Sequence, residues 1–462
     1  MTTYISTRGQ AGRRSFEDVL LAGLAEDGGL FVPESWPVFT AAELRAMRGL
    51  DYPSLAARLL APFTEGCFAH DDLLRLARHA YAAFDHAATA PLRHLAGDDW
   101  LLELFHGPTL AFKDFAMQLL AAMFDEVLAR RGEHLTIVGA TSGDTGAAAV
   151  HAFAGKRQIR IAMLHPHGRV SPVQRRQMTT VLADNVLNVA LRGTFDDCQD
   201  LVKAMFNDVP FRRAMRLSAV NSINWARVVA QSVYYVWAGL RLGAPDRELA
   251  FCVPTGNFGN VYAGRVAAAI GLPVAKLVVA TNENDILARF FASRSYTRGT
   301  VVPTTSPSMD IQVASNFERL LLELEGNDAA RTRGRMQAFA QAGRFSLEGA
   351  IPALFAGGSA DQAAVAATIS ATLAATGELV DPHTGVALAV AARHRPEPGV
   401  PLVALATAHP AKFPEAVQAA TGIHPALPER YADLMSMPER SLLLDNDLKA
   451  VETAVSQTFG AA

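Results

Sequence analysis

Lysine is rare in this chain, and Lys113 stands where a lysine could do chemistry. The sequence holds six lysines among its 42 lysine and arginine residues, and Lys113 is the only one before residue 156. Unlike arginine, a lysine amine can lose its proton and attack a carbonyl carbon. Because Phe112 and Phe115 flank it, we expect desolvation to lower the pKa of the amine. The alternative is a lysine that only pairs with its neighbour Asp114.

The segment 254–260, Pro-Thr-Gly-Asn-Phe-Gly-Asn, has the features of a phosphate cradle. Gly256 and Gly259 let the backbone approach a ligand, and the helix predicted to follow would present free N–H groups to an anion. The segment lacks the lysine of nucleotide-binding P-loops and the dinucleotide glycine pattern, so a small phosphate monoester fits better than a nucleotide. The alternative is an ordinary glycine-rich turn between strand and helix. The other residues of the cradle are Asn257, Phe258 and Asn260.

The segment 139–146, Gly-Ala-Thr-Ser-Gly-Asp-Thr-Gly, is a second turn of this kind. Ser142 and Thr145 would add hydroxyl donors to the backbone N–H groups, which suits a carboxylate or a second phosphate. The alternative is that Ser142 and Asp144 only cap the helix.

Two further segments carry polar side chains suited to anions. In 221–227, Asn224 and Arg227 are three residues apart at a predicted helix start and so share one face, where the arginine could grip an oxyanion. The alternative is a surface salt bridge.

The segment 406–413 lies just beyond a predicted strand. Ligands of open α/β sheets gather outside the carboxyl ends of strands, so Thr407, His409 and Lys412 are placed to reach a site.

The elements that would position these residues alternate between strand and helix. We predict strands at 135–139, 249–253, 274–280 and 401–407, and helices at 114–131, 144–155, 225–241, 260–270, 313–325 and 360–376. This alternation indicates α/β architecture with mostly parallel sheets. The first 95 residues or so are richer in helix and look like an added N-terminal unit.

Composition narrows the class of protein. The formal net charge is −3, and no basic cluster suggests a nucleic-acid partner. The three cysteines are far apart, which argues for a reducing compartment and against a disulfide framework or a zinc site; we predict no metal. Charged residues within 1–20 leave no room for a signal peptide, and no run is long enough to span a bilayer. We therefore expect a cytoplasmic protein without a membrane partner.

Together these pieces are most of what pyridoxal 5'-phosphate requires: a Schiff-base lysine, a cradle for its phosphate, and a group to meet its pyridine nitrogen.

With these motifs in order, the chain closely resembles the threonine synthase family, pyridoxal-phosphate enzymes of the tryptophan-synthase-β-like fold (fold type II). The resemblance runs nearly end to end, over 4–33, 106–115, 139–146, 221–227, 254–260, 281–287, 305–310, 315–319, 381–384 and 406–413.

This resemblance implies a fold and a division of the chain. It implies two three-layer αβα domains with a helix-rich N-terminal unit. The implied boundaries are 1–95 for the N-terminal unit, 96–132 with 228–462 for the large cofactor-binding domain, and 133–227 for the smaller α/β domain.

The resemblance also assigns roles. Lys113 would hold the cofactor and later shuttle protons, residues 256–260 would hold its phosphate, Thr407 would face the pyridine nitrogen, and Asp144 would lie near the cofactor's oxygen side. The residues implied to bind the substrate are Thr141, Ser142 and Thr145 for its carboxylate and Asn224, Arg227 and Lys412 for its phosphate.

The implied reaction converts O-phospho-L-homoserine and water to L-threonine and phosphate by γ-elimination and β-hydration, the last step of threonine biosynthesis in the aspartate family of amino acids. Two alternatives remain: a threonine-synthase-like phospho-lyase that releases 2-oxobutyrate, and a catalytically silent homologue that only binds the cofactor. Monomer and homodimer are both compatible with the resemblance.

Overall fold

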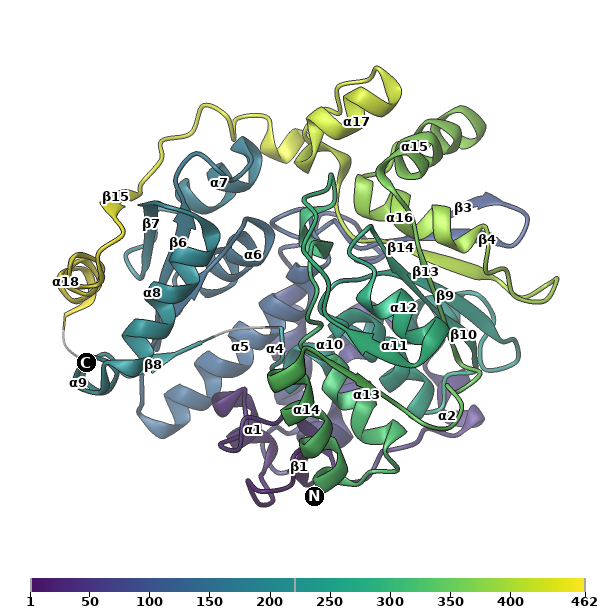
Figure 1. Ribbon diagram of the computed structural model, residues 1–462, viewed down its shortest axis with the longest axis horizontal. Coiled ribbons are helices and arrows are strands. Elements are labelled where there is room, and N and C mark those ends of the chain that lie inside the picture. The colour runs from purple at the N-terminus through teal and green to yellow at the C-terminus, as the bar shows by residue number, and fades with distance from the viewer. Residues whose placement is uncertain (1, 220–221, 461–462) are drawn as a thin grey trace. The chain divides into compact units, whose positions relative to one another are not determined.

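The computed structural model describes residues 2–219 and 222–460, which form two compact units. The larger unit contains residues 1–106 and 222–425, and the smaller contains 107–221 and 426–462 (Figure 1). Figure 1 identifies the segments of each by colour and label.

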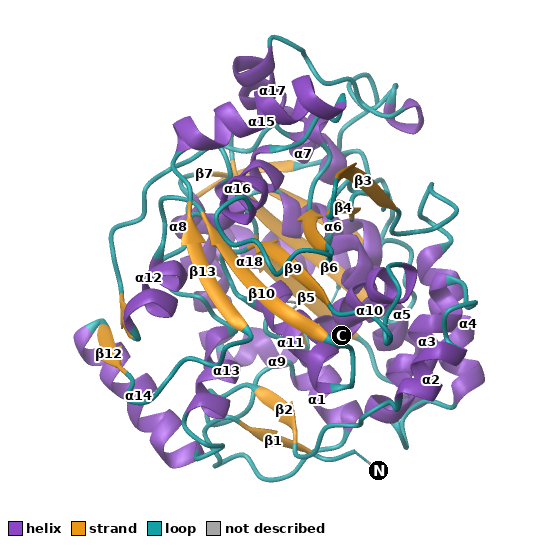
Figure 2. Ribbon diagram, turned by 90° about the vertical axis from the view of Figure 1, so that its right-hand side faces the viewer, coloured by secondary structure: helices purple, strands orange, loops and turns teal. Residues whose placement is uncertain are grey.

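A six-stranded sheet organises the larger unit. Its strand order is β13-β10-β9-β14-β4-β3, and all neighbours pair in parallel except β3 and β4. The strands are β3 (Leu92–Ala96), β4 (Asp99–Glu103), β9 (Leu249–Pro254), β10 (Val274–Thr281), β13 (Phe355–Ser359) and β14 (Leu402–Ala406). Figure 2 shows β13, β10 and β9 side by side.

The central strands are covered on both faces, which explains their apolar sequences. Every residue of β9 is buried, as expected for a strand inside a parallel sheet. On one face Ala250 and Cys252 join an apolar core with helix α16 (Pro382–Ala391). On the other face Phe251 packs edge-on against Tyr235 of helix α10 (Trp225–Arg241), with ring centroids 4.8 Å apart.

Twelve α-helices and two small antiparallel sheets complete the described part of the larger unit. The sheets pair β1 (Tyr4–Ser6) with β2 (Phe31–Pro33) and β11 (Ser295–Thr297) with β12 (Arg344–Ser346). The other helices are α1 (Phe16–Ala22), α2 (Ala41–Ala46), α3 (Tyr52–Leu60), α4 (His70–Tyr81), α11 (Gly259–Ala269), α12 (Ile286–Ser293), α13 (Phe317–Leu324), α14 (Ala329–Ala342), α15 (Gln362–Thr376) and α17 (Pro414–Thr421).

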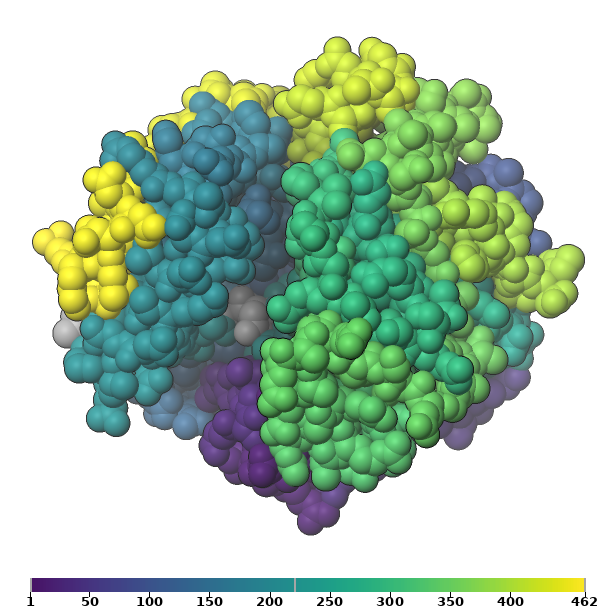
Figure 3. All heavy atoms as spheres, viewed as in Figure 1, coloured from purple at the N-terminus to yellow at the C-terminus, as the bar shows by residue number. Residues whose placement is uncertain are grey.

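The smaller unit is built on a fully parallel five-stranded sheet, in the order β15-β7-β6-β5-β8. The strands are β5 (Leu135–Ala140), β6 (Ile159–Pro166), β7 (Val186–Arg192), β8 (Leu217–Ser218) and β15 (Leu442–Asp445). The helices are α5 (Lys113–Arg131), α6 (Asp144–Phe153), α7 (Pro172–Thr179), α8 (Phe195–Asn207), α9 (Val209–Ala214) and α18 (Leu448–Phe459). In Figure 3 the yellow C-terminal residues lie against the teal residues of this unit.

The two units divide the chain differently from the predicted domains in four places. Residues 107–132 belong to the smaller unit because α5 packs against α6. Residues 426–462 belong there too, because β15 extends the sheet beside β7. Residues 222–227 belong to the larger unit, as does the whole predicted N-terminal unit.

The predicted elements are confirmed with small shifts. All four predicted strands are present, and α10 has the predicted bounds. The helix predicted at 313–325 begins later, at Phe317, because residues before it bond elsewhere: the Ala314 N–H donates to the Tyr296 hydroxyl, and the Asn316 N–H donates to the carbonyl of Asn257. Across the residues described, no helix combines the length and apolar character needed to cross a membrane.

Candidate active site

The predicted site residues fall into two sets, one in each unit. The larger unit holds the cradle at 256–260 together with Asn224, Arg227, Thr407 and Lys412. The smaller unit holds Lys113, Asp144 and the turn residues Thr141, Ser142 and Thr145.

The cradle and Thr407 lie at one edge of the larger sheet. Strands β9 and β14 are parallel neighbours, so the segments that follow them leave from the same edge. The cradle follows β9 and leads into α11, and Thr407 is the first residue after β14. Thr407 is buried. This topology brings the two predicted segments to the carboxyl end of the sheet.

Close packing of the chain itself leaves little room for a side chain at the two glycines of the cradle. A Cβ at Gly256 would lie 3.1 Å from the Cα of Met309, and one at Gly259 would lie 3.2 Å from the Nδ2 of Asn316. Phe258, the N-cap of α11, has a left-handed backbone with φ of 64° and makes no capping hydrogen bond through its side chain. The turn therefore stays tight and leaves the helix start open to an anion.

Asn260 presents a buried donor at the start of α11. Its Oδ1 accepts hydrogen bonds from the hydroxyls of Tyr234 (2.6 Å) and Tyr235 (2.9 Å). Its Nδ2 has no hydrogen-bond partner among the described residues. Because two tyrosines fix the oxygen, the amide nitrogen is oriented for a ligand acceptor.

A second layer of contacts holds the cradle in place. The Ser315 hydroxyl donates to Oδ1 of Asn257 (3.1 Å), and Nδ2 of Asn316 donates to the Asn257 carbonyl (3.1 Å). The guanidinium of Arg319, which is completely buried, donates in turn to Oδ1 of Asn316 and to the carbonyls of Phe31 and Ile223. The segment 315–319 therefore supports the cradle from behind.

Asn224 caps helix α10. Its Oδ1 accepts from the Ala226 N–H (2.9 Å), and its Nδ2 donates to the Leu20 carbonyl (2.9 Å). An amide has two N–H donors, so one can still meet a ligand. Asn221, the first residue of the predicted 221–227 segment, lies outside the described residues.

Arg227 is buried, with 4% of its surface exposed, so the alternative of a surface salt bridge is wrong. Burial lowers the pKa of its guanidinium to about 10, against a smaller opposing effect of Tyr234. Its Nε and Nη1 have no hydrogen-bond partner among the described residues. A buried cation with open donors is suited to bind an anion.

The segment after β14 carries the other predicted residues of the larger unit. Lys412 is completely buried in a short 3₁₀ turn, Pro410–Lys412. Burial, reinforced by the nearby His106, lowers the pKa of His409 to about 4. Nδ1 of His409 accepts from the Ala411 N–H (3.1 Å), so the neutral ring shapes this turn.

In the smaller unit Lys113 meets a carboxylate distant in sequence. Its amine is 3.0 Å from Oδ2 of Asp144 and 5.2 Å from the ring centroid of Phe112. Asp114 has another role: its carboxylate accepts from the backbone N–H and the hydroxyl of Thr109, both at 2.7 Å. The structure therefore shows Asp144 as a partner of Lys113.

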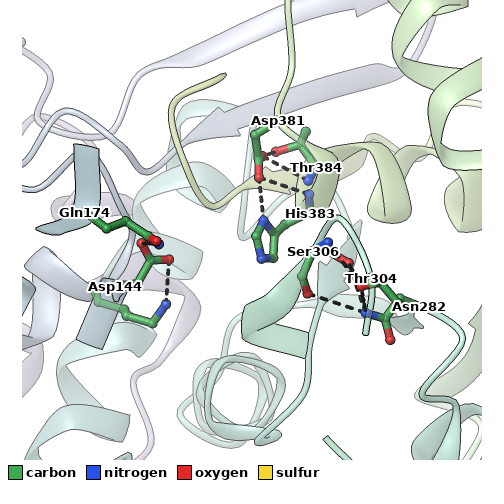
Figure 4. Close-up of polar contacts among 9 residues, drawn as sticks. Asp144, Gln174, Asn282, Thr304, Ser306, Asp381, His383 and Thr384 are labelled. Carbon is green, nitrogen blue, oxygen red and sulfur yellow. Dashed lines mark hydrogen bonds and ion pairs between the residues drawn. The ribbon is translucent and has the colours of Figure 1, made fainter. Parts of the chain in front are cut away.

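Asp144 is itself held from its other side. Nε2 of Gln174 donates to Oδ1 of Asp144 at 2.8 Å, and the Ser171 hydroxyl donates to Oε1 of Gln174 at 3.0 Å. Figure 4 shows the amide of Gln174 against the Asp144 carboxylate. The lysine and the glutamine thus fix a buried carboxylate between them.

The turn after β5 is organised by Thr141. Its hydroxyl oxygen accepts the N–H groups of Gly143 (3.0 Å) and Gly146 (2.9 Å). The N-cap of α6 is Gly143, with no side-chain capping bond among the described residues, so the alternative that Ser142 and Asp144 cap this helix is wrong. Ser142 is exposed and Thr145 is half-buried, which leaves both hydroxyls able to reach a ligand.

Sequence reasoning assigned no role to Gln174 or Arg319. Gln174 lies at the start of α7, just after the carboxyl end of β6, where the rule that ligands gather at strand ends could have found it. Arg319 carries no comparable local signal, because its acceptors are 3, 96 and 288 residues away.

Comparisons with known proteins identify the class of enzyme to which this chain belongs. Residues 86–371 match the family described as pyridoxal-phosphate dependent enzyme. Residues 3–81 match the threonine synthase N terminus, and residues 384–455 match the threonine synthase C-terminal region. With its α/β architecture and parallel sheets, the chain is a fold type II pyridoxal-phosphate enzyme.

Relatives that match this chain over nearly their whole length identify its family within that class. The threonine synthase of Pseudomonas aeruginosa is 52% identical over 98% of each chain. A crystal structure of pyridoxal-phosphate-bound threonine synthase from Brucella melitensis has a TM-score of 0.98 at 52% identity, covering both chains completely. Human threonine synthase-like 2 is 36% identical over 96% of this chain and 93% of its own. The chain belongs to the threonine synthase family.

The donors of the site fit this cofactor. The Nδ2 of Asn260 and the open helix start suit a phosphate group, and the Thr407 hydroxyl suits a ring nitrogen. Lys113 supplies a buried amine with a carboxylate beside it. The residues present match the chemistry that pyridoxal phosphate requires.

Proposed function

We propose that this chain is a threonine synthase, converting O-phospho-L-homoserine and water to L-threonine and phosphate at the end of threonine biosynthesis. The observation that carries the proposal is its full-length similarity to the Pseudomonas aeruginosa threonine synthase, 52% identical over 98% of each chain. The buried donors of the site support it, because both the cofactor and the substrate carry phosphate.

Lys113 is the proposed catalytic residue. The bound cofactor supplies the electron-withdrawing system that makes the protons on Cα and Cβ of the amino acid removable. Lys113 would bind the cofactor's aldehyde carbon through Nζ and, once displaced by the substrate, would take and return protons with the same nitrogen. Asp144 would orient the lysine amine, since it lies 3.0 Å from it and is itself held by Gln174.

The remaining predicted residues would bind the cofactor and the two ends of the substrate. Residues 256–260 would hold the cofactor phosphate, and the Thr407 hydroxyl would meet its pyridine nitrogen. Arg227, with open donors, would hold the substrate phosphate together with Lys412 and one N–H of Asn224. The substrate carboxylate would meet the turn formed by Thr141, Ser142 and Thr145.

Product analysis tests the proposal. The protein, loaded with pyridoxal phosphate, is incubated with O-phospho-L-homoserine, and phosphate, threonine and 2-oxobutyrate are measured together. We expect threonine and phosphate in equal amounts. Phosphate accompanied by 2-oxobutyrate in place of threonine would contradict the proposed reaction.

Chemical labelling tests the role of Lys113 independently of turnover. Borohydride reduction of the loaded protein should leave a pyridoxyl group on the peptide that contains Lys113. Lys113→Ala should lose both the label and threonine formation, whereas Lys449→Ala, at an exposed lysine in the smaller unit, should keep both. A label elsewhere would remove Lys113 from its proposed role.

The phospho-lyase alternative is tested by the same assay, since it would release 2-oxobutyrate in place of threonine. Human threonine synthase-like 2 shares 36% identity with nearly the whole chain. The threonine synthase of Pseudomonas aeruginosa is more similar, at 52% identity, which favours the synthase. A catalytically silent homologue would yield neither phosphate nor a keto acid in the same assay.

We also propose a cytoplasmic enzyme that acts as a monomer or a homodimer. Cys198 and Cys252 are buried and take part in no disulfide, in keeping with a reducing compartment. Burial raises the pKa of the Cys198 thiol to about 11, so it is not a reactive thiolate near neutral pH. Size-exclusion chromatography with light scattering decides the oligomeric state.

A further inference from the structure

A buried histidine with one open ring nitrogen stands at the start of helix α16. His383 has 4% of its surface exposed. Its Nδ1 lies 2.6 Å from Oδ2 of Asp381, and its Nε2 has no hydrogen-bond partner among the described residues. Leaving such a buried nitrogen without a partner is costly, so a partner absent from the protein chain is expected.

Asp381 fixes the ring that carries this nitrogen. It is completely buried, and its carboxylate also accepts the backbone N–H groups of His383 (3.0 Å) and Thr384 (3.0 Å) and the Thr384 hydroxyl. Four acceptor contacts hold the carboxylate in one orientation. Figure 4 shows the imidazole of His383 hydrogen-bonded to Asp381 through Nδ1, so that the edge of the ring carrying Nε2 faces away from the carboxylate.

The histidine belongs to the same region of the larger unit as Thr407. Helix α16 packs against β14, the strand that ends immediately before Thr407. Thr384 lines a small cavity together with Ala406 and Ala408, the two neighbours of Thr407. The ring of His383 also packs against Phe413, with centroids 4.8 Å apart. The pair therefore lies alongside the segment proposed to meet the cofactor ring.

We propose that His383 is a further cofactor-binding residue, whose Nε2 hydrogen-bonds to the bound pyridoxal phosphate, and that Asp381 is the positioning residue that fixes the ring. This inference rests on the proposed function for the identity of the cofactor. Because Nδ1 donates to the Asp381 carboxylate, Nε2 is the ring nitrogen that is left to contact the ligand.

Two substitutions distinguish the contributions of the two ring nitrogens of His383. In His383→Asn the shorter amide reaches only as far as Nδ1, so the contact with Asp381 is kept and the Nε2 group is lost. In His383→Gln the longer amide reaches the place of Nε2. We expect His383→Asn to weaken binding of pyridoxal phosphate to the apoenzyme about tenfold and His383→Gln to change it less than about threefold.

The dissociation constant is measured by titrating each apoenzyme with pyridoxal phosphate and following cofactor absorbance. In parallel, the ring nitrogens of wild-type apoenzyme are followed by ¹⁵N NMR during the same titration. The signal of His383 is assigned by its loss in one folded variant. We expect the Nε2 resonance of His383 to shift when pyridoxal phosphate alone is added.

An ordered water bound to Nε2 is the main competing explanation. It would lower the melting temperature of both apoenzyme variants, leave the dissociation constant of the cofactor unchanged, and leave the Nε2 resonance in place; that outcome overturns the inference. An Nε2 shift that requires O-phospho-L-homoserine or inorganic phosphate would place the substrate there and also overturn it.

Failure of this inference differs from failure of the proposed function. If wild-type protein binds pyridoxal phosphate at Lys113 while His383→Asn binds it equally well, the inference fails and the proposed function stands. If wild-type protein forms no pyridoxyl-Lys113 on reduction, the proposed function itself fails.

Discussion

Two buried arginines of the larger unit, Arg227 and Arg319, carry the same electrostatic cost and differ in what surrounds them. Burial lowers the pKa of each guanidinium to about 10. Arg319 is completely buried, and Arg227 is 4% exposed. Removing a cation from water is expensive wherever it occurs in the fold, so each site needs compensating contacts.

Hydrogen-bond acceptors within the protein compensate the burial of the Arg319 guanidinium. Its Nε donates to the Phe31 carbonyl at 3.0 Å and its Nη2 to the Ile223 carbonyl at 2.6 Å, while Nη1 bonds the side chain of Asn316. These acceptors belong to three separate segments of one unit. Arg319 therefore ties the support of the cradle to the N-terminal region.

Arg227 lacks this compensation in the described part of the chain. Its Nε and Nη1 are buried without acceptors. Equal burial therefore leaves the two guanidinium groups in different states. The hydrogen bonds of Arg319 stabilise the fold, whereas the donors of Arg227 that lack a partner are suited to the anionic ligand proposed above.

Replacing Arg227 should affect catalysis more than any other change considered for these two arginines. We expect Arg227→Met to reduce kcat/KM for O-phospho-L-homoserine about a thousandfold, or about 4 kcal/mol, because the substrate phosphate loses its buried partner. The apoenzyme should be no less stable, since an uncompensated charge is removed. Steady-state kinetics and urea unfolding measure the two effects.

Arg227→Lys is the matched control for this variant. It keeps the charge and loses the forked donor geometry, so its loss of kcat/KM should be intermediate. Unchanged kinetics in Arg227→Met would remove Arg227 from the substrate site.

Arg319→Met should have the opposite profile. Three acceptors lose their charged donor, so we expect the apoenzyme to lose about 3 kcal/mol of stability, visible as a lower urea midpoint. Arg13→Met is the exposed control. The Arg13 side chain is 70% exposed in its ion pair with Glu34, so its loss should leave the urea midpoint close to that of wild type. Equal stability of the Arg319 variant and wild type would contradict its structural role.

Binding of inorganic phosphate distinguishes the two arginines without turnover. At about 100 times its dissociation constant, phosphate should stabilise the wild-type apoenzyme by about 2.7 kcal/mol, measured by thermal unfolding. Arg227→Met should lose most of this shift, and Arg319→Met should keep it although its starting stability is lower. A full shift in Arg227→Met would place the phosphate elsewhere.

Like the two arginines, His409 is a buried titratable group, but its neutral ring makes a hydrogen bond within the protein. Its folded pKa is about 4, against an ordinary value of 6.5, so between these pH values the unfolded chain binds more protons than the folded one. Stability from this group is therefore present above pH 6.5 and is lost as the pH falls toward 4. We expect a loss of about 2 kcal/mol by pH 5.

Urea unfolding at pH 7 and pH 5 checks this loss for wild type and His409→Gln, in which no titrating ring remains. The difference between the two pH values should be smaller by about 2 kcal/mol in the variant. The same pH dependence in both proteins would show that other groups dominate acid destabilisation.

The sequence predicted the order of elements well because their signals are local. Periodic apolar residues and glycine-containing turns placed the strands at 249–253 and 274–280 and the helix at 225–241 within a residue or two. The start of the helix predicted at 313–325 was missed because Asn316 bonds to Asn257 of the cradle, a contact invisible to local patterns. The domain boundary near residue 107 was also missed, since the packing of α5 against α6 decides it.

For the site, the types of residue were predictable and their partners were not. The glycines of the cradle were found from the strand and helix around them. Neither the Asp144 contact of Lys113 nor the open Nε2 of His383 could be read in advance, because each depends on which groups surround the side chain in space.

The residue types that could take part in chemistry follow from the sequence alone: a rare lysine, a lysine-free cradle and hydroxyls beyond strand ends. The surroundings of each buried arginine depend on how the chain folds. The Phe31 carbonyl that satisfies Arg319 lies 288 residues away, and no residue near Arg227 in sequence shows that its donors stay open. Burial and hydrogen-bond partners arise from segments that meet in space, and they distinguish an arginine whose donors are all bonded within the fold from one whose donors lack partners.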